Sequence, residues 1–172
     1  DLILRNGTVV TPHGVSEQDV AVSGEIISAI TAPNIIGEDQ VTKSIDATGK
    51  IVMPGGIDPH VHCKWIMPMP DGSVGYTDGP EIVSRAALFG GTTTMIDFAA
   101  RIEDIPFKAI IKKRDQDWDN NCYCDYSYHL MLLGDVEPPV LSEIEQLIAD
   151  GYPTIKIFTT NITPSRSGRI DY

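Results

Sequence analysis

The fold is decided by residues 54–62, whose sequence is PGGIDPHVH. The stretch predicts a strand over 57–62 that ends in two histidines. Because side chains alternate between the two faces of a strand, Asp58, His60 and His62 are expected on the same face. Two neutral imidazoles that converge at one strand end form a chelate for a divalent metal, and zinc favours nitrogen ligands. We therefore predict a metal site at the end of this strand.

Predicted strands and helices alternate downstream of this stretch. Further strands are predicted over residues 93–98, 123–133 and 154–159. Helices are predicted over residues 79–89, 106–118 and 141–149. Asp78 and Glu81 have the spacing of a capping box, with Asp78 as the N-cap of the first helix. Strands that recur roughly every 30 residues, with helices between them, predict βαβ units and a parallel sheet.

The length of this segment favours one parallel architecture. A (β/α)8 barrel has ~250 residues, or about 31 for each unit, so residues 54–172 correspond to just under four units. Four parallel strands could also form a small flavodoxin-like layer, but no glycine-rich phosphate loop follows the first strand. We predict an α/β fold in which residues 54–172 form the first half, about four strands, of a truncated TIM barrel. Active sites of such barrels lie at the C-terminal ends of the strands, where the histidine pair falls.

Residues 1–53 follow a different pattern, with short apolar runs, frequent turns and no helical period. The runs at 19–22 and 26–30 flank a glycine turn and predict a hairpin. Other short strands are predicted at residues 2–4, 8–10 and 44–47. These residues are predicted to form a small β-sheet module that is separate from the barrel-like segment.

Lys156 is a further candidate functional residue. It lies in the strand predicted over 154–159, and an unpaired ammonium inside a parallel sheet is costly because such strands are buried on both faces. One interpretation is a lysine that extends its charged end to the surface. The other is a lysine whose lowered pKa leaves a neutral amine, which captures carbon dioxide and becomes a carbamate that bridges two metals.

Charge and composition exclude several classes of partner. The 172 residues include 24 acidic and 13 basic side chains, which gives a formal net charge of -11. Nucleic acids and anionic membranes need clustered Lys and Arg, so neither is an expected partner. No apolar run approaches the roughly 18 residues that cross a bilayer, and the first residues lack the layout of a signal peptide. With only three cysteines, we expect a reduced, cytoplasmic protein.

Several of these stretches resemble one enzyme family. Residues 54–62 and 86–98 (AALFGGTTTMIDF) closely resemble the amidohydrolase superfamily. Residues 124–129 (CDYSYH) and 155–158 (IKIF) are similar to its dihydropyrimidinase and hydantoinase branch. The resemblance covers the whole chain and implies that residues 1–53 begin the small β-sandwich domain of that family. It also implies that the chain is the N-terminal third to half of such an enzyme, which forms a homo-oligomer, a tetramer or a dimer.

The resemblance implies a site with two zinc ions per subunit. His60 and His62 match the ligands of the more buried metal, and Lys156 matches the carboxylated lysine that bridges both ions. The family takes two further histidines and an aspartate from later strands, and these are absent here because His13 and His129 precede the fourth strand.

Other residues near these motifs have predicted roles. Asp58 is expected to orient an imidazole through a hydrogen bond, with a purely structural role as the alternative. His129 is expected to satisfy a polar network, and Cys63 to be a packed thiol. A substrate gate is predicted in the loop after the histidines, formed by the side chains of Trp65, Ile66 and Met67.

Asn161 marks a departure from the family. Five residues beyond the lysine the family usually has a tyrosine that donates to the developing oxyanion, and this chain has Asn161 there. An amide can donate the same hydrogen bond with a shorter reach, so Asn161 is a candidate oxyanion donor. The expected substrate is a small cyclic amide or imide that need not be a typical dihydropyrimidine or hydantoin.

The predicted function is a binuclear-zinc hydrolase that opens a cyclic amide or imide ring by attack of a metal-activated hydroxide. Residues 1–172 alone are expected to be inactive. One alternative is a non-catalytic dihydropyrimidinase-like assembly protein, which has no need of His60, His62 and Lys156 together. Another is a hydrolase similar to allantoinase or dihydroorotase, which has the same metals.

Overall fold

The computed structural model describes residues 1–134 and 136–159. The chain divides into two compact units, Asp1–Pro54 and Gly55–Tyr172. Within the described part, no helix is both long enough and apolar enough to cross a membrane.

The first unit is a five-stranded sheet in which β1 is central. Its strands are β1 (Leu2–Thr11), β2 (Gly14–Ser23), β3 (Ile26–Thr31), β4 (Lys43–Asp46) and β5 (Ile51–Val52), with a 3-10 turn at Glu38–Gln40. Strand β1 pairs antiparallel with β2 and parallel with β4 and β5, and β2 pairs antiparallel with β3 as the expected hairpin. The prediction of two strands at 2–4 and 8–10 was wrong. Asn6 has a φ of 60°, and the register shift there lets one strand continue through the irregularity.

The second unit contains a four-stranded parallel sheet in the order β11-β10-β9-β6. Its strands are β6 (Gly56–Asp58), β9 (Thr92–Ala100), β10 (Asp125–Met131) and β11 (Ile155–Lys156). The helices between them are α1 (Pro80–Phe89), α2 (Phe107–Trp118) and α3 (Pro138–Ala149). The alternation of strands and helices and the parallel pairing confirm the predicted α/β arrangement.

All three helices pack against one face of this sheet. Its core joins Met95, Tyr128 and Leu130 of the strands to Phe107 and Trp118 of α2, with residues from α1 and α3 packed around them. Fully burying such a side chain contributes about 1.5–3 kcal/mol.

Along β9 the side chains alternate, so Met95, Asp97 and Ala99 share the helix side and Phe98 points to the opposite face. The buried carboxylate of Asp97 and the Phe98 ring therefore lie on opposite faces of the sheet, near the end of the same strand.

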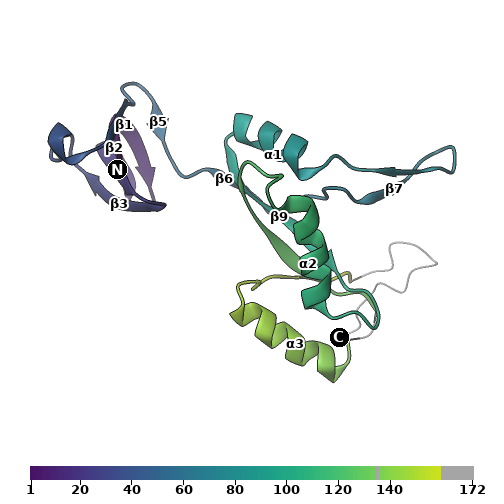
Figure 1. Cartoon of the computed structure of the whole chain (residues 1–172). Helices are drawn as coiled ribbons and strands as arrows, with labels where there is room; N and C mark the ends of the chain where they lie inside the picture. Colours follow the sequence, from purple (N-terminus) through teal and green to yellow (C-terminus); the bar gives the residue numbers. More distant parts are fainter. Residues whose placement is uncertain (135, 160–172) are drawn as a thin grey trace. The chain divides into compact units, whose positions relative to one another are not determined.

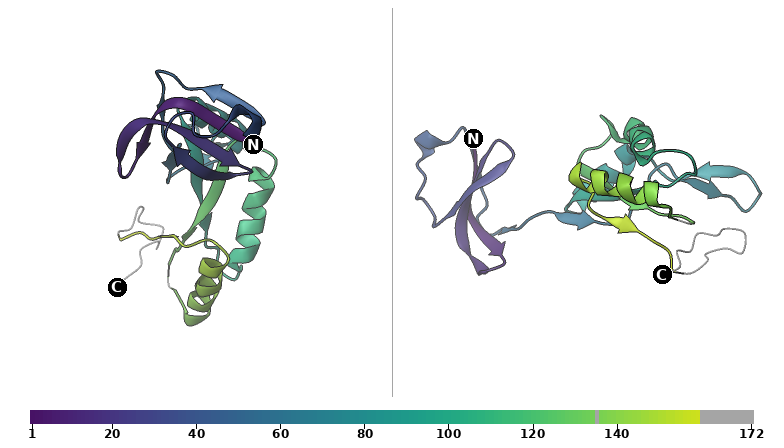
Figure 2. Two further views of the ribbon diagram at one scale, coloured as in Figure 1. Left: turned by 90° about the vertical axis from the view of Figure 1, so that its left-hand side faces the viewer. Right: turned by 90° about the horizontal axis from the view of Figure 1, so that it is seen from below.

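A short hairpin projects from this unit between β6 and α1. It consists of β7 (Ile66–Pro68) and β8 (Val74–Tyr76), which pair antiparallel. Figures 1 and 2 show it extending away from the sheet and helices of its own unit. Its apolar side chains are exposed, including Ile66 and Met67.

Several element boundaries differ from the predicted ones. Helix α1 has Gly79 as its N-cap and Pro80 in its first turn, so Asp78 does not form a capping box. Helix α3 begins three residues earlier than predicted because Pro138 suits a first helical turn. Strand β6 ends at Asp58, before the histidines, since Pro59 lacks the N–H group that would extend the ladder.

Candidate active site

His60 and His62 converge just beyond the end of β6. The Nε2 atoms of the two rings lie 3.3 Å apart, and the ring centroids are 5.2 Å apart. The Val61 backbone N–H donates to the Ile96 carbonyl at 3.2 Å, which keeps this segment beside β9 although it is no longer a strand. Val61 is buried while both histidines are exposed. The predicted alternation therefore persists beyond the strand and directs both imidazoles to one side.

The spacing of the two nitrogens fits a tetrahedral cation. Two Nε2 atoms 3.3 Å apart, each at the usual zinc–nitrogen distance of about 2.0–2.1 Å, subtend an angle of about 107° at the ion. Although the residue is exposed, the His62 ring packs against Phe98 and Trp65, and this partial loss of hydration lowers its pKa below the ordinary 6.5. The negative charge of Asp97 opposes the shift, and the positive charges of His60, Lys156 and Arg114 add to it. A neutral imidazole is the form that ligates a metal.

Phe98 brings the candidate residues together. It is 1% exposed, and its ring stacks on the His62 imidazole at 4.7 Å between centroids. The His60 ring contacts it edge-on at 4.8 Å, and His129 lies 5.3 Å from it. The Nζ atom of Lys156 is 5.6 Å from the centre of the same ring. Groups from the segment after β6, from β10 and from β11 thus meet over one aromatic side chain at the end of β9.

Lys156 is less buried than the sequence suggested. Its side chain is half-buried, and its Nζ atom also lies 5.1 Å from the Phe158 ring centroid. The reason is that β11 pairs only with β10 in the described part of the chain, so it forms the edge of the sheet. Within the described residues this edge position accounts for the half-burial of Lys156, and its role stays a prediction.

His129 links the candidate site to the neighbouring strand. One ring nitrogen, Nε2, lies 2.8 Å from the Pro59 carbonyl oxygen, and Nδ1 lies 2.7 Å from Thr154 Oγ1. Because a carbonyl only accepts, Nε2 donates and Nδ1 accepts from the threonine hydroxyl. Both nitrogens are occupied, which agrees with the predicted role in a polar network.

Asp58 and Cys63 flank the histidine pair. Asp58 Oδ1 accepts the backbone N–H of His60 at 3.0 Å, and among the described residues no hydrogen bond joins Asp58 to an imidazole. Asp58 therefore shapes the backbone that carries His60. Cys63 is 1% exposed, and burial raises the pKa of its thiol to about 12, as expected for a packed thiol.

The three residues predicted as a gate have different surroundings. The Trp65 indole is half-buried, lies edge-on to the His62 ring at 4.7 Å and donates from Nε1 to Asp97 at 2.9 Å. Ile66 and Met67 belong to β7 of the projecting hairpin and are 67% and 44% exposed. Asn161 lies outside the described residues.

Asp97 and Arg114 had no predicted role, although both lie next to this site. Asp97 is fully buried, and Arg114 Nη2 donates to it at 2.5 Å. A carboxylate inside the otherwise apolar run at residues 95–100 could have drawn attention to Asp97, because buried charges require partners. Arg114 lies on α2 among several charged residues, and nothing in its pattern distinguishes it.

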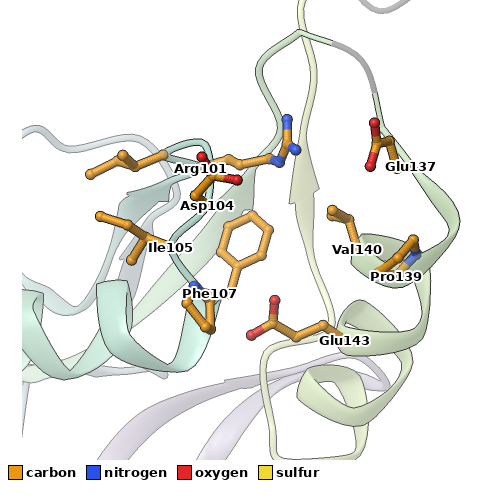
Figure 3. Close-up of a pocket in the computed structure, with 10 residues that line it drawn as sticks. Arg101, Asp104, Ile105, Phe107, Glu137, Pro139, Val140 and Glu143 are labelled. Atoms are coloured by element: carbon orange, nitrogen blue, oxygen red, sulfur yellow. The ribbon is translucent and has the colours of Figure 1, made fainter.

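The described side chains hold no group of three or more His, Cys, Asp and Glu residues that could bind a metal ion. What they offer is the histidine pair with Lys156 nearby. A separate pocket lies between the loop after β9 and helix α3, where Arg101 and Asp104 face Glu137 and Glu143 (Figure 3). None of its lining residues belongs to the candidate site.

Comparison with known proteins places the chain in a family. No family model matches it. A D-hydantoinase from Streptomyces coelicolor is 33% identical over 158 residues, covering 91% of this chain and 33% of that protein. A dihydropyrimidinase from Arabidopsis thaliana is 35% identical over 162 residues, covering 91% of this chain and 28% of that protein.

The similarity extends to solved structures. The structure of a D-hydantoinase from Bacillus sp. AR9 matches with a TM-score of 0.80 at 33% identity, covering 99% of this chain and 35% of that one. The chain thus spans about a third of the length of the relatives it matches. The chain belongs to the dihydropyrimidinase and D-hydantoinase branch of the amidohydrolase superfamily.

Proposed function

We propose that these residues belong to a metal-dependent hydrolase that opens the ring of a small cyclic amide or imide. The observation that carries the proposal is the convergence of the His60 and His62 Nε2 atoms at 3.3 Å. The names of the relatives, D-hydantoinase and dihydropyrimidinase, support the substrate class. A non-catalytic assembly protein would have no need of two imidazoles at that spacing.

We assign the metal to His60, His62 and Lys156. Two neutral imidazoles supply nitrogen ligands, and the Lys156 amine supplies oxygen ligands once it has attacked carbon dioxide and lost a proton to become a carbamate. Bound zinc would supply Lewis acidity that activates water and polarises the ring carbonyl. These three residues do not complete the ligands of a second ion, and none of them is assigned to transfer the proton.

The chain's own residues prepare this site in two ways. Loss of hydration around the His62 ring lowers its pKa and so favours the neutral imidazole, which is the form that binds a cation. Phe98 and Trp65 enclose the His62 ring from its face and its edge, so the imidazole has little freedom to rotate. Fixed ligand orientation is what a preorganised metal site requires.

We also propose the finer fold assignment. The second unit, with its parallel sheet and helices on one face, would form the first half of a (β/α)8 barrel whose interior is the face that carries Phe98, His129 and the histidine pair. The first unit would be part of a β-sandwich. The hairpin residues Ile66 and Met67, with Trp65 at its base, would border the substrate, and the homo-oligomer stays a prediction.

The test is zinc content and ring opening in the intact protein. Wild-type protein purified in the presence of zinc should hold about two ions per chain and gain the mass of carbon dioxide at Lys156. It should hydrolyse at least one member of a panel of hydantoins, dihydrouracil, cyclic imides and lactams. His62→Ala should lose zinc and turnover, and His13→Ala, which removes an exposed histidine of the first unit, should lose neither.

Wild-type protein that holds no zinc and opens no ring in the panel would overturn the proposal. Full zinc content and turnover in His62→Ala would show that another group holds the metal. The panel also tests Asn161 as the oxyanion donor. If the wild type hydrolyses dihydrouracil at an ordinary rate and Asn161→Ala leaves that rate unchanged, another residue is the donor.

A further inference from the structure

Asp97 accepts four hydrogen bonds at the point where the chain leaves the histidine pair. Its Oδ2 atom accepts the backbone N–H of Cys63 at 3.1 Å and Arg114 Nη2 at 2.5 Å. Its Oδ1 atom accepts Trp65 Nε1 at 2.9 Å and the backbone N–H of Phe98 at 2.7 Å. The carboxylate is fully buried, so each of these partners replaces a water that it has lost.

These bonds fix the backbone directly after His62. Arg114 Nη2 also donates to the Cys63 carbonyl at 2.8 Å, so the ion pair holds both the N–H and the C=O of Cys63. Thr77 Oγ1 donates to the His62 carbonyl and accepts the Trp65 N–H at 2.9 Å. The Lys64 N–H also donates to the Asp78 carbonyl at 3.0 Å, so successive peptide groups from His62 to Trp65 are anchored.

The same carboxylate holds both aromatic neighbours of the His62 ring. Phe98 stacks on that ring at 4.7 Å with an interplanar angle of 21°, and its backbone N–H is bound to Asp97. Trp65 meets the ring edge-on at 4.7 Å, and its indole N–H donates to Asp97 Oδ1, the same oxygen that accepts the Phe98 N–H. One buried group thus determines the backbone beneath the imidazole and the two walls beside it.

We propose that Asp97, paired with Arg114, is the positioning residue of His62 and sets the affinity of the site for its metal. The inference rests on the proposed function, because it assumes that His62 is a ligand. Asp97 acts from the helix side of β9 and touches neither the metal nor the substrate. Removing groups that orient metal ligands typically weakens metal binding by about 10–100-fold.

The experiment compares matched variants of the intact protein. Asp97→Asn keeps the shape of the side chain but loses the charge and one acceptor, and Trp65→Phe keeps the aromatic contact but loses only the N–H donor. The control is Asp19→Asn, which makes the same change in a fully buried aspartate that pairs with Arg5 in the other unit. Zinc affinity is measured by competition with a chelator, and the site geometry by the visible spectrum of the cobalt(II) form.

We expect Asp97→Asn to bind zinc about 10–100-fold more weakly than wild type and to shift the cobalt(II) spectrum. Trp65→Phe should show a smaller change of the same sign, and Asp19→Asn should match wild type in both measurements. The conservative Arg114→Lys should retain part of the affinity that Arg114→Ala loses, because it keeps the charge but not the planar pair of donors.

Three results would overturn the inference. Wild-type zinc affinity in Asp97→Asn would do so while leaving the proposed function intact. An equal loss in Asp19→Asn would mean that zinc affinity follows overall stability. If Asp97→Asn does not fold, the test relies on Trp65→Phe. Wild-type zinc affinity and an unchanged cobalt(II) spectrum in that variant would contradict the inference. A wild-type protein that binds no zinc would instead overturn the proposed function, and the inference with it.

Discussion

In the described part of each unit a fully buried aspartate pairs with an arginine, and the two pairs hold different kinds of backbone. In the first unit Arg5 Nη1 donates to Asp19 at 3.1 Å, and Asp19 also accepts the backbone N–H groups of Asn6 and Asn34 at 2.9 Å each. Asn6 and Asn34 both have left-handed backbone, with φ values of 60° and 66°. Asparagine tolerates that conformation, so the Asp19 pair supports a strand irregularity at Asn6 and a turn at Asn34 that cost little.

In the second unit the Asp97–Arg114 pair supports a segment whose backbone is strained. Lys64, with a φ of 52°, lies between Cys63 and Trp65, the two residues that donate to Asp97. Lysine has no local hydrogen bond that favours left-handed backbone, so holding it there costs about 1–2 kcal/mol. Strain of this kind persists only where the surroundings enforce it, and here the segment follows the histidine pair. The difference indicates that Asp19 serves the fold and that Asp97 serves the candidate site as well.

The largest expected effect comes from removing either arginine. Arg5→Ala and Arg114→Ala each leave a fully buried carboxylate without its cation, and each should lower the free energy of unfolding by about 3–5 kcal/mol. Urea denaturation of the intact variants measures this. Only Arg114→Ala should also weaken zinc binding. Equal zinc affinities for the two variants would remove the distinction between the pairs.

The contribution of the Asp19 pair to stability should be lost in acid. Burial alone would raise the pKa of Asp19, but hydrogen bonds from Asn6, Asn34 and Arg5 outweigh burial and hold the pKa below its ordinary 3.8. A lowered pKa contributes stability that is present above pH 3.8 and is lost as the pH falls below it toward the lowered value. Asp19→Asn should therefore flatten the decline in stability of the first unit as the pH falls below about 4. A decline as steep as that of wild type would contradict the assigned cause.

The smallest expected effect is a gain in stability. Lys64→Asn replaces a residue that is strained in left-handed backbone with one that tolerates it, and should stabilise the protein by up to about 1 kcal/mol. The lost ion pair between Lys64 Nζ and Asp117, 3.0 Å long and partly exposed, offsets little of this. Thermal unfolding of the intact protein measures the gain. A destabilised Lys64→Asn would mean that the backbone at this position is not strained.

Much of the second unit could be predicted from periodicity. The alternation of apolar strands and amphipathic helices predicted four parallel strands and three helices, and the spacing of His60 and His62 predicted that their rings would share a side. Both predictions depend on local geometry that neighbouring residues impose. Boundaries were less accurate because Pro59, Gly79 and Pro138 act through backbone conformation at single positions.

The contacts that complete the site could not be predicted, because they join residues far apart in the chain. Cys63, Asp97 and Arg114 come from a loop, a strand and a helix, and their separation is set by how α2 packs on β9. Among the described residues the half-burial of Lys156 follows from the position of β11 at the sheet edge, which only the pairing of strands reveals. Sequence patterns identified the chemical groups, and tertiary packing decided which of them meet.

Anomalous X-ray diffraction at the zinc absorption edge, on crystals of the intact zinc-loaded protein, tests the metal assignment most directly. We predict an anomalous peak within about 2.0–2.1 Å of both His60 Nε2 and His62 Nε2, with density for a carbamate continuous with Lys156 Nζ. Zinc-loaded crystals with no anomalous peak at the histidine pair and an unmodified Lys156 amine would contradict it.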